Sequence, residues 1–344
     1  MTATIDTAQQ RTPVRRPGRR TAALLLLALL ALALVCLASI MFGSKPLTAG
    51  QVWDAVTGHG DAYTTTVVES RYPRTALGIV VGLGLAVAGV LMQAVTRNPL
   101  AEPGLLGVNT GAAASVVAGT AFAGASGQTQ TLLWALPGAL LTGVFVYVIG
   151  TLGRGLNPVR LVLGGAVLTA VLSAFVQAVT LSRPRVFDSY RYWVVGALGG
   201  HDWDAVRSVL PLTVAGLAVA LFLGRSLNVV ALGEDSATAL GARPERVKAA
   251  ALLTATLLSA AATAAAGPIA FVGLAVPHLA RTLLGADLRR QLALSALLGP
   301  TLLLAADVIG RLLVRPQELM VGVVTAFAGA PALLIAVRRM RAAS

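Results

Sequence analysis

Residues 71–112 read RYPRTALGIVVGLGLAVAGVLMQAVTRNPLAEPGLLGVNTGA, and this stretch decides how the chain folds. An uncharged run over residues 75–96 is long enough for a helix that crosses a bilayer, which needs roughly 20 residues. Arg71 and Arg74 precede the run, and Arg97-Asn98-Pro99 ends it, because proline stops a helix and restricts the residue before it. The stretch predicts a membrane-spanning helix followed by a fixed, irregular connection.

Composition extends this prediction to the whole chain. Of 344 residues, 56% are hydrophobic and only 12% are charged, which excludes a water-soluble domain. Uncharged stretches that can each hold a span cover residues 21–44, 75–96, 103–153, 161–182, 208–224, 249–280, 291–306 and 319–337. The sequence therefore predicts an all-α integral membrane protein.

Two of these stretches hold two spans each. Residues 103–153 contain the turn-forming segment 124–130 in their middle. Gly267-Pro268 breaks the other stretch into spans of about 249–266 and 269–285. We therefore expect about ten transmembrane helices, with both termini on one side.

The distribution of charge supports ten spans. They place 18 of the 27 Lys and Arg residues on the side of the termini, whereas a single span over 249–280 leaves 14 against 13. Positive residues favour the cytoplasm, so we expect cytoplasmic termini. Residues 1–20 then form a basic cytoplasmic tail and residues 21–341 one polytopic transmembrane domain. The net charge of +13 follows from this topology and requires no nucleic acid.

The chain shows no motif for chemistry of its own. Neither Lys45 nor Lys248 lies in the Gly-Lys-Ser/Thr setting that binds phosphate, and no catalytic triad, metal spacing or paired catalytic carboxylates are present. Cys36, the only cysteine, excludes an intrachain disulfide. We expect no catalytic or metal site and no cofactor bound by this chain. If ATP drives transport, another chain must bind the ATP and Mg.

Polar residues inside the membrane are costly, so their arrangement is informative. On the fifth predicted span they recur at spacings of 4, 4 and 3, which places them within an arc of roughly 80° on one helix face. These residues are Thr169, Ser173, Gln177 and Thr180. The stripe fits either hydrogen bonding between helices or a wetted translocation path.

Two connections follow spans that end at the cytoplasm. Asn98-Pro99-Leu100 and Asn157-Pro158 each fix non-helical backbone at the inner end of the predicted bundle. They are either gate elements or ordinary loop caps.

The largest internal loop, about residues 225–248, contains the signals of capped helices. Asp235-Ser236-Ala237 begins a short segment with an N-cap type of residue, and Leu240-Gly241 ends it with a left-handed stop. Arg243-Pro244-Glu245 then opens another helix, with proline in its first turn. Such capping is unusual for a loop without a partner.

On the outer side, Asp307 and Arg311 are spaced i, i+4 on the ninth span, and Glu318 opens the tenth. An exposed pair of this kind contributes only a few tenths of a kcal/mol. Arg71 and Arg74 fit interfacial anchors of the second span.

Residues in an ordered series from 71 to 331 resemble the FecCD type of permease, the membrane subunit of ABC importers for iron-siderophores and vitamin B12. The resemblance includes the stretch quoted above and later motifs. These motifs are Leu232-Gly233, Leu240-Gly241, Gly267-Pro268-Ile269-Ala270-Phe271-Val272-Gly273-Leu274, Pro277-His278, Arg281, Asp307 with Arg311, Glu318, Gly322 and Gly329-Ala330-Pro331.

The resemblance implies roles for the residues introduced above. It places Asn98, Leu100, Asn157 and Pro158 at cytoplasmic gates and the stripe of the fifth span on the path. It implies coupling to a separate ATPase through Asp235, Ser236, Ala237, Leu240, Gly241 and Arg243, and docking of an extracytoplasmic binding protein on Arg71, Arg74 and Arg311.

The expected function is therefore that of a permease in a prokaryotic cell membrane, which imports ferric siderophores and pairs with ATP-binding subunits and a second permease. The second permease is either an identical chain or a similar one. Vitamin B12 or haem is the alternative cargo. An ion-coupled secondary transporter would carry buried carboxylates near the midplane, and Asp307 lies too near the outer end. A non-transport anchor is a further alternative, against which the polar stripe and the capped loop argue.

Overall fold

Helices make up every regular element of the chain in the computed structural model, which describes residues 17–153 and 156–342, with side chains up to residue 331. Seven helical stretches of this part are long and apolar enough to cross a membrane. They are α1 (Pro17–Met41), α3 (Ala62–Glu69) with α4 (Arg71–Thr96), α6 (Gln128–Thr151), α7 (Pro158–Ser182), α9 (Trp203–Ala231), α11 (Pro244–Ala266) and α13 (Leu288–Leu313).

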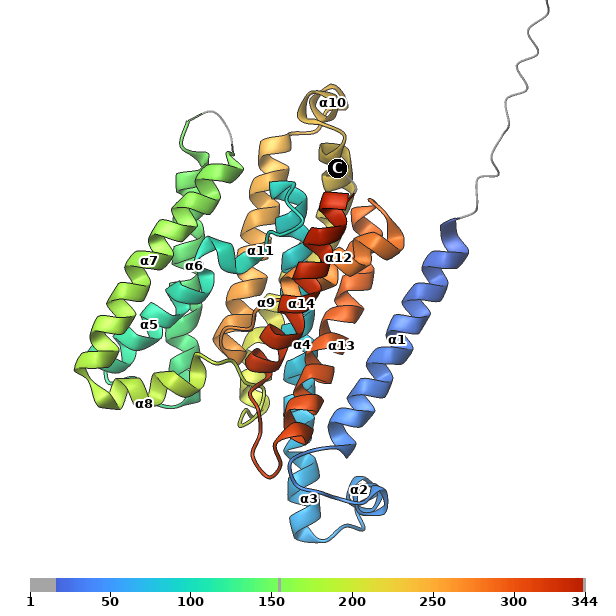
Figure 1. The fold of residues 1–344 in the computed structure, drawn as a ribbon, viewed down its shortest axis with the longest axis vertical. Coiled ribbons are helices and arrows are strands. Elements are labelled where there is room, and N and C mark those ends of the chain that lie inside the picture. Colours follow the sequence, from blue (N-terminus) through green and yellow to red (C-terminus); the bar gives the residue numbers. More distant parts are fainter. Residues whose placement is uncertain (1–16, 154–155, 343–344) are drawn as a thin grey trace, which may run out of the picture.

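Three further helices with mostly apolar sequences complete the bundle (Figure 1): α5 (Val108–Phe122), α12 (Val272–Leu284) and α14 (Val321–Ala342). The remaining elements are short and lie in the connections. They are α2 (Ala49–Val56), η1 (Pro103–Leu106), α8 (Pro184–Trp193) and α10 (Glu234–Ala239).

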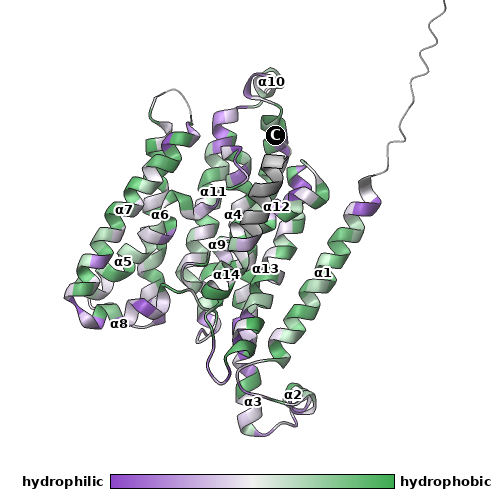
Figure 2. Ribbon diagram, in the orientation of Figure 1, coloured by the Kyte–Doolittle hydropathy of each residue, from purple (hydrophilic) through white to green (hydrophobic). Residues whose placement is uncertain are grey.

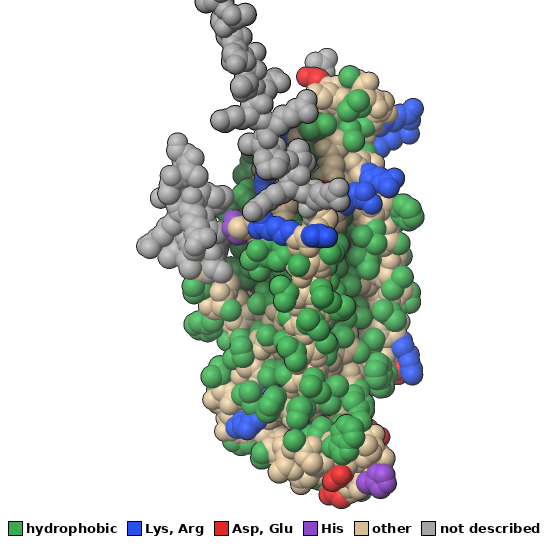
Figure 3. All heavy atoms as spheres, turned by 90° about the vertical axis from the view of Figure 1, so that its right-hand side faces the viewer, with side chains coloured by type: hydrophobic (Ala, Val, Ile, Leu, Met, Phe, Trp, Pro, Cys, Tyr) green, Lys and Arg blue, Asp and Glu red, His purple; other side chains and the backbone are tan. Residues whose placement is uncertain are grey.

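The two ends of the bundle carry different connections (Figure 1). The helix α10 lies at one end, here called the inner end, whereas α2, α3 and α8 lie toward the opposite, outer end. Apolar sequence fills the long helices between the two ends, and hydrophilic residues gather mainly near them (Figure 2). The space-filling view from the α1 side shows the same pattern, with a hydrophobic band between charged ends (Figure 3).

The helix α4 forms the centre of the bundle and packs against α13, α11, α12 and α9. Its glycines allow this close packing: a Cβ added to Gly82 would lie 2.7 Å from backbone atoms of Pro300, and one added to Gly89 would lie 1.9 Å from the carbonyl oxygen of Gly273. Small residues at such crossings let two helix backbones approach. The quoted stretch therefore supplies the central helix of the fold.

Both helix breaks predicted from the sequence are confirmed. The helix α11 ends at Ala266, Gly267 has a positive φ of 75°, and α12 begins at Val272. Likewise, α5 ends at Phe122 and α6 begins at Gln128. One boundary differs, because α1 begins at Pro17, within the segment expected to be a tail. Residues 1–16 of that tail lie outside the described part of the chain.

Candidate transport site

A cavity of about 550 Å³ lies along the outer half of α7. Three residues of the polar stripe, Ser173, Gln177 and Thr180, line it together with Asn109 and Thr110 of α5. None of the described side chains that line this cavity carries a charge. Two aromatic residues of α8, Phe187 and Tyr190, also contribute. The cavity thus offers neutral hydrogen-bonding groups beside apolar and aromatic surface.

The stripe forms no hydrogen-bonded seam between helices in the described part of the chain. Thr180 donates its hydroxyl hydrogen bond to the carbonyl oxygen of Val176, within α7, at 2.7 Å. The side chains of Thr169, Ser173 and Gln177 form no hydrogen bond with another described residue. Thr169 lies beside the turn at Gly107 and not in the cavity lining. The arrangement supports the path interpretation for the other three residues, which stays a prediction.

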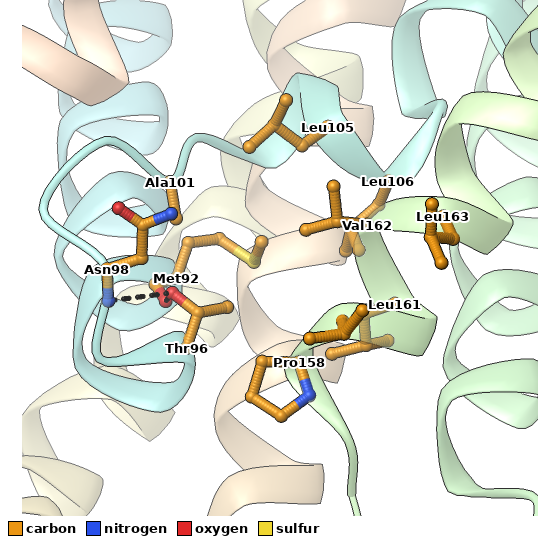
Figure 4. Close-up of a pocket in the computed structure, with 11 residues that line it drawn as sticks. Met92, Thr96, Asn98, Ala101, Leu105, Leu106, Pro158, Leu161, Val162 and Leu163 are labelled. Carbon is orange, nitrogen blue, oxygen red and sulfur yellow. Dashed lines mark hydrogen bonds between the residues drawn. The ribbon is translucent and has the colours of Figure 1, made fainter.

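A second cavity, of about 280 Å³, lies near the inner end between α4, η1 and α7. Asn98 and Met92 lie on the α4 side of this cavity, and Pro158 and Leu161 lie on its α7 side (Figure 4). The two inner connections are therefore brought together around one space. We call this space the inner gate pocket.

The other two predicted gate residues, Leu100 and Asn157, do not line the inner gate pocket. The side-chain oxygen of Asn157 accepts hydrogen bonds from the backbone N–H groups of Val159 and Arg160, so Asn157 caps α7 in the ordinary way. The backbone N–H of Leu100 donates to the side-chain oxygen of Asn98 at 2.9 Å. Leu100 thus contributes to a tight turn.

The short helix α10 ends in the left-handed stop that the sequence predicts. Gly241 has a φ of 79°, its N–H donates to the carbonyl of Thr238, and the N–H of Ala242 donates to the carbonyl of Ala237. This pair of hydrogen bonds defines a Schellman motif. Ala237 is buried, and the other predicted coupling residues are exposed: Asp235, Ser236, Leu240, Gly241 and Arg243.

One detail of this loop was predicted wrongly. Asp235 lies inside the first turn of α10, and Gly233, with a φ of 117°, precedes the helix without a side-chain cap. The acidic residues there still favour the positive end of the helix dipole. Pro244 does begin a helix as expected, but this helix is the long α11 itself.

One basic residue binds α10, and a second binds the end of α9 that precedes it. Lys248 of α11, whose side chain is 10% exposed, forms an ion pair with Glu234. The hydrogen bond and the charge of Lys248 lower the pKa of Glu234. Arg97, at the end of α4, donates a hydrogen bond of 3.1 Å to the carbonyl oxygen of Val230, near the end of α9.

A buried ion network lies toward the outer end. Asp307 is fully buried between Arg74, whose Nη2 lies 2.7 Å from its Oδ1, and Arg311, whose Nη2 lies 2.9 Å from its Oδ2. Arg74 also contacts Glu318 at 2.7 Å. Burial alone would raise the pKa of Glu318, but the charge of Arg74 and the hydrogen bond from Ser44 lower it. The Asp307–Arg311 pair is therefore not the exposed pair that the sequence suggested.

The same network fixes the outer end of α1. Arg71 donates hydrogen bonds to the carbonyls of Ile40, Met41 and Lys45, and Arg311 donates to those of Ser39 and Phe42. Cations satisfy the free carbonyls at a helix C-terminus and interact favourably with its dipole. Both guanidinium groups thus act as caps for α1.

The three arginines predicted to dock the binding protein are largely buried. Arg71, Arg74 and Arg311 do come together, and they line an outer cavity of about 430 Å³ with Glu318 and His201. However, Arg71 and Arg311 are only 5% and 1% exposed, and all three bond to groups of this chain. Most of their hydrogen-bonding capacity is therefore directed at groups of this chain.

Sequence reasoning did not single out Asn109 and Thr110, which line the cavity beside α7, or Arg97, which binds α9. Asn109 and Thr110 stand in an apolar span, which is the same signal that identified the stripe on α7. Arg97 gave no such signal, because an arginine at the cytoplasmic end of a span is common. Its bond to α9 joins residues far apart in the chain.

Comparison with known proteins identifies the class of this polytopic membrane protein. The FecCD transport family matches residues 30–339, and the chain belongs to this family. It is thus related to multi-pass permeases of prokaryotic ABC importers.

Curated relatives include three with different cargo in their names. The ferric enterobactin transport system permease protein FepD of Escherichia coli is 47% identical over 304 residues, covering 88% of this chain and 90% of FepD. The cobalamin import system permease protein BtuC of Halobacterium salinarum is 34% identical, covering 93% of this chain and 88% of BtuC. The hemin transport system permease protein HmuU of Yersinia pestis is 35% identical, covering 88% and 91%.

The fold is also similar to a solved structure. A metal-chelate type ABC transporter in an inward-facing conformation superposes with a TM-score of 0.82 at 26% identity, covering 92% of this chain and 99% of the other. The helical arrangement is therefore that of an ABC transporter permease.

Proposed function

We propose that the chain is the permease subunit of an ATP-driven importer of ferric siderophores. The observation that carries this proposal is the 47% identity with the ferric enterobactin permease along almost the whole chain. The neutral cavity beside α7 fits it, since amide, hydroxyl and aromatic groups can contact a bulky polar chelate without binding it tightly.

The proposal assigns ten spans, with both termini in the cytoplasm. The seven long stretches together with α5, α12 and α14 supply this number. The helix α1 begins and α14 ends on the side that carries α10 (Figure 1). The inner end would then face the cytoplasm.

Partner proteins would supply ATP binding and the second wall of the translocation path. Two ATP-binding subunits would bind ATP and Mg and dock on α10, where the exposed leucines that flank the helix, Leu232 and Leu240, offer apolar contact surface. A second permease subunit would close the path along the polar face of α7. Movement of the ATPase subunits would then shift α10 and open the inner gate pocket by rigid-body steps.

An extracytoplasmic binding protein would deliver the cargo to the outer end. Of the three arginines, Arg74 is the most accessible, with 13% of its side chain exposed, and its partner Glu318 is 33% exposed. We assign the docking contact to this edge of the outer cavity, where a carboxylate of the partner can compete with Glu318.

Uptake of labelled cargo tests the proposed function. A strain that lacks this gene should lose uptake of ferric siderophore labelled with radioactive iron, retain uptake of labelled cobalamin, and regain siderophore uptake from a plasmid copy. The alternative cargoes are cobalamin and haem, which the similarity to BtuC and HmuU supports. Loss of cobalamin or haem uptake with unchanged siderophore uptake would establish the alternative.

A further inference from the structure

Arg97 occupies a special position at the inner end of α4. It is the C-cap of that helix and adopts a left-handed conformation with a φ of 52°, which non-glycine residues rarely adopt. This conformation ends α4, and the side chain extends to the neighbouring helix. Its Nη2 atom lies 3.1 Å from the carbonyl oxygen of Val230. Arg97 is thus a cation at the C-terminus of α9, where the helix dipole favours positive charge.

On one side, Arg97 is joined directly to the inner gate pocket. The next residue, Asn98, lines that pocket opposite Pro158. Asn98 also closes a tight turn: its side-chain oxygen accepts from the N–H of Leu100 at 2.9 Å, and its carbonyl accepts from the N–H of Ala101 at 3.1 Å. Two hydrogen bonds thus tie the backbone that follows Arg97 to the wall of the inner gate pocket.

On the other side, the acceptor of Arg97 leads directly into α10. Val230 precedes Glu234, the first residue of α10, by one turn, and its carbonyl also accepts from the N–H of Gly233 at 3.2 Å. Glu234 is paired with Lys248 of α11. The positive charge of Arg97 adds to that of Lys248 in lowering the pKa of Glu234. Glu234 is therefore paired with a cation on α11 and also feels the charge of a cation on α4, which itself binds the end of α9.

We propose that Arg97 is a positioning residue that transmits the movement of α10 to the inner gate pocket, through its hydrogen bond to Val230 and the turn at Asn98. This inference rests on the proposed function, because it assumes that an ATPase moves α10. Beyond the proposed function, it names the physical connection between α10 and the inner gate pocket. The helices α4, α9 and α11 also pack against one another, but a substitution at Arg97 breaks this hydrogen bond while α10 and the inner gate pocket stay in place.

The test uses the complete transporter, with its ATPase and binding protein, in membrane vesicles that expose the inner end. A Cys36→Ser background removes the only native cysteine, and Val159→Cys places a reporter in the lining of the inner gate pocket. The measured quantity is the rate at which a membrane-impermeant maleimide labels the reporter, with and without ATP and vanadate.

Arg97→Asn is the informative variant, because asparagine tolerates the left-handed conformation while the guanidinium is lost. We expect ATP hydrolysis to stay near the parent level, siderophore uptake to fall about tenfold, the size of a typical coupling effect, and labelling to lose its dependence on nucleotide. Arg97→Lys should restore part of the dependence. Arg225→Asn removes an exposed cation of α9 that forms no hydrogen bond or ion pair with another described residue, and should behave like the parent.

Two results would overturn the inference. One is nucleotide-dependent labelling in Arg97→Asn that equals the parent, because gating would then proceed without the connection. The other is loss of ATP hydrolysis together with loss of ATPase binding, because Arg97 would then act in docking. Failure of the proposed function is recognised separately, since the parent itself would then show no ATP-dependent uptake.

Discussion

Asp307 illustrates how a single residue gains its importance from burial. It is enclosed by Arg74 and Arg311. Arg311 and the neighbouring Arg71 bond to the carbonyls that end α1. The i, i+4 spacing with Arg311 is readable from the sequence. The contact with Arg74 is not, because it joins residues 233 positions apart. The i, i+4 spacing also does not reveal that the Asp307–Arg311 pair is buried, and burial is what makes the pair structurally important.

Neutralising Asp307 should therefore reduce the stability of the protein strongly. In Asp307→Asn two buried guanidinium groups lose their carboxylate, and we expect a loss of about 3–5 kcal/mol of stability, the range for breaking a buried pair. Glu318→Gln is the matched control, since Glu318 is partly exposed and its pair with Arg74 should be worth about 1 kcal/mol or less. Thermal unfolding in detergent measures both. Equal shifts in Tm for the two variants would contradict the buried network.

Docking of the binding protein is better tested at Glu318 than at the three arginines. Reversing Arg71 or Arg311 removes helix caps and would disturb the fold, so a loss of binding would have two explanations. Glu318→Gln instead weakens the competition for Arg74 and leaves the arginines in place. It should increase the affinity of the binding protein at low salt, and the gain should shrink at high salt.

Affinity of the detergent-solubilised permease for the cargo-loaded binding protein is the quantity to measure. Glu69→Gln, which removes an exposed carboxylate at the end of α3, serves as the control. If Glu318→Gln and Glu69→Gln give the same affinity as the parent at low salt, Arg74 does not form the docking contact.

At the scale of elements, the sequence predicts helices well where local chemistry determines their ends. Gly267 and Gly241 both adopt positive φ at the positions expected to stop helices. The short helices α2, α3 and α8 were not predicted, although α2 begins with the capping box of Thr48 and Gln51 and α3 with the N-cap Asp61. The helix α8 instead depends on packing: its Val186 is 4% exposed and lies in a cluster with residues of α5 and α7. Such contacts carry no local signal.

Gly241 allows a test of the coupling element. No atom lies within 4 Å of a Cβ placed there, so a side chain meets only the strain of the left-handed backbone. Gly241→Val should therefore weaken the stop of α10 and reduce uptake and stimulated ATP hydrolysis together, whereas Gly241→Asn should be tolerated. Binding of the cargo-loaded protein should remain in both. Wild-type uptake and hydrolysis in Gly241→Val would rule out the coupling assignment.

At the scale of the whole molecule, the sequence predicts a helical membrane protein because its uncharged runs have the length of a bilayer. It could not predict which helix faces which. The gathering of Asn109 and Thr110 with the stripe on α7 depends on the crossing of α5 and α7. The contact of α4 with α12 depends in turn on the approach of Gly89 to Gly273.

The proposed topology can be checked with single cysteines in a Cys36→Ser background. Ser236→Cys on α10 should react with an impermeant maleimide only in inside-out vesicles. Asp61→Cys, just before α3, should react only from the outer side of intact cells or spheroplasts. Labelling of both positions from the same side would exclude ten spans with cytoplasmic termini.

Reconstituted transport tests the central claim most directly. The purified permease and its ATPase are placed in liposomes that enclose ATP, and the binding protein with radioactive ferric siderophore is added outside. We predict accumulation inside the liposomes that requires ATP, the ATPase and the binding protein. Accumulation that proceeds without ATP under an ion gradient, or no accumulation when all components are present and ATP is hydrolysed, would contradict an ATP-driven siderophore permease.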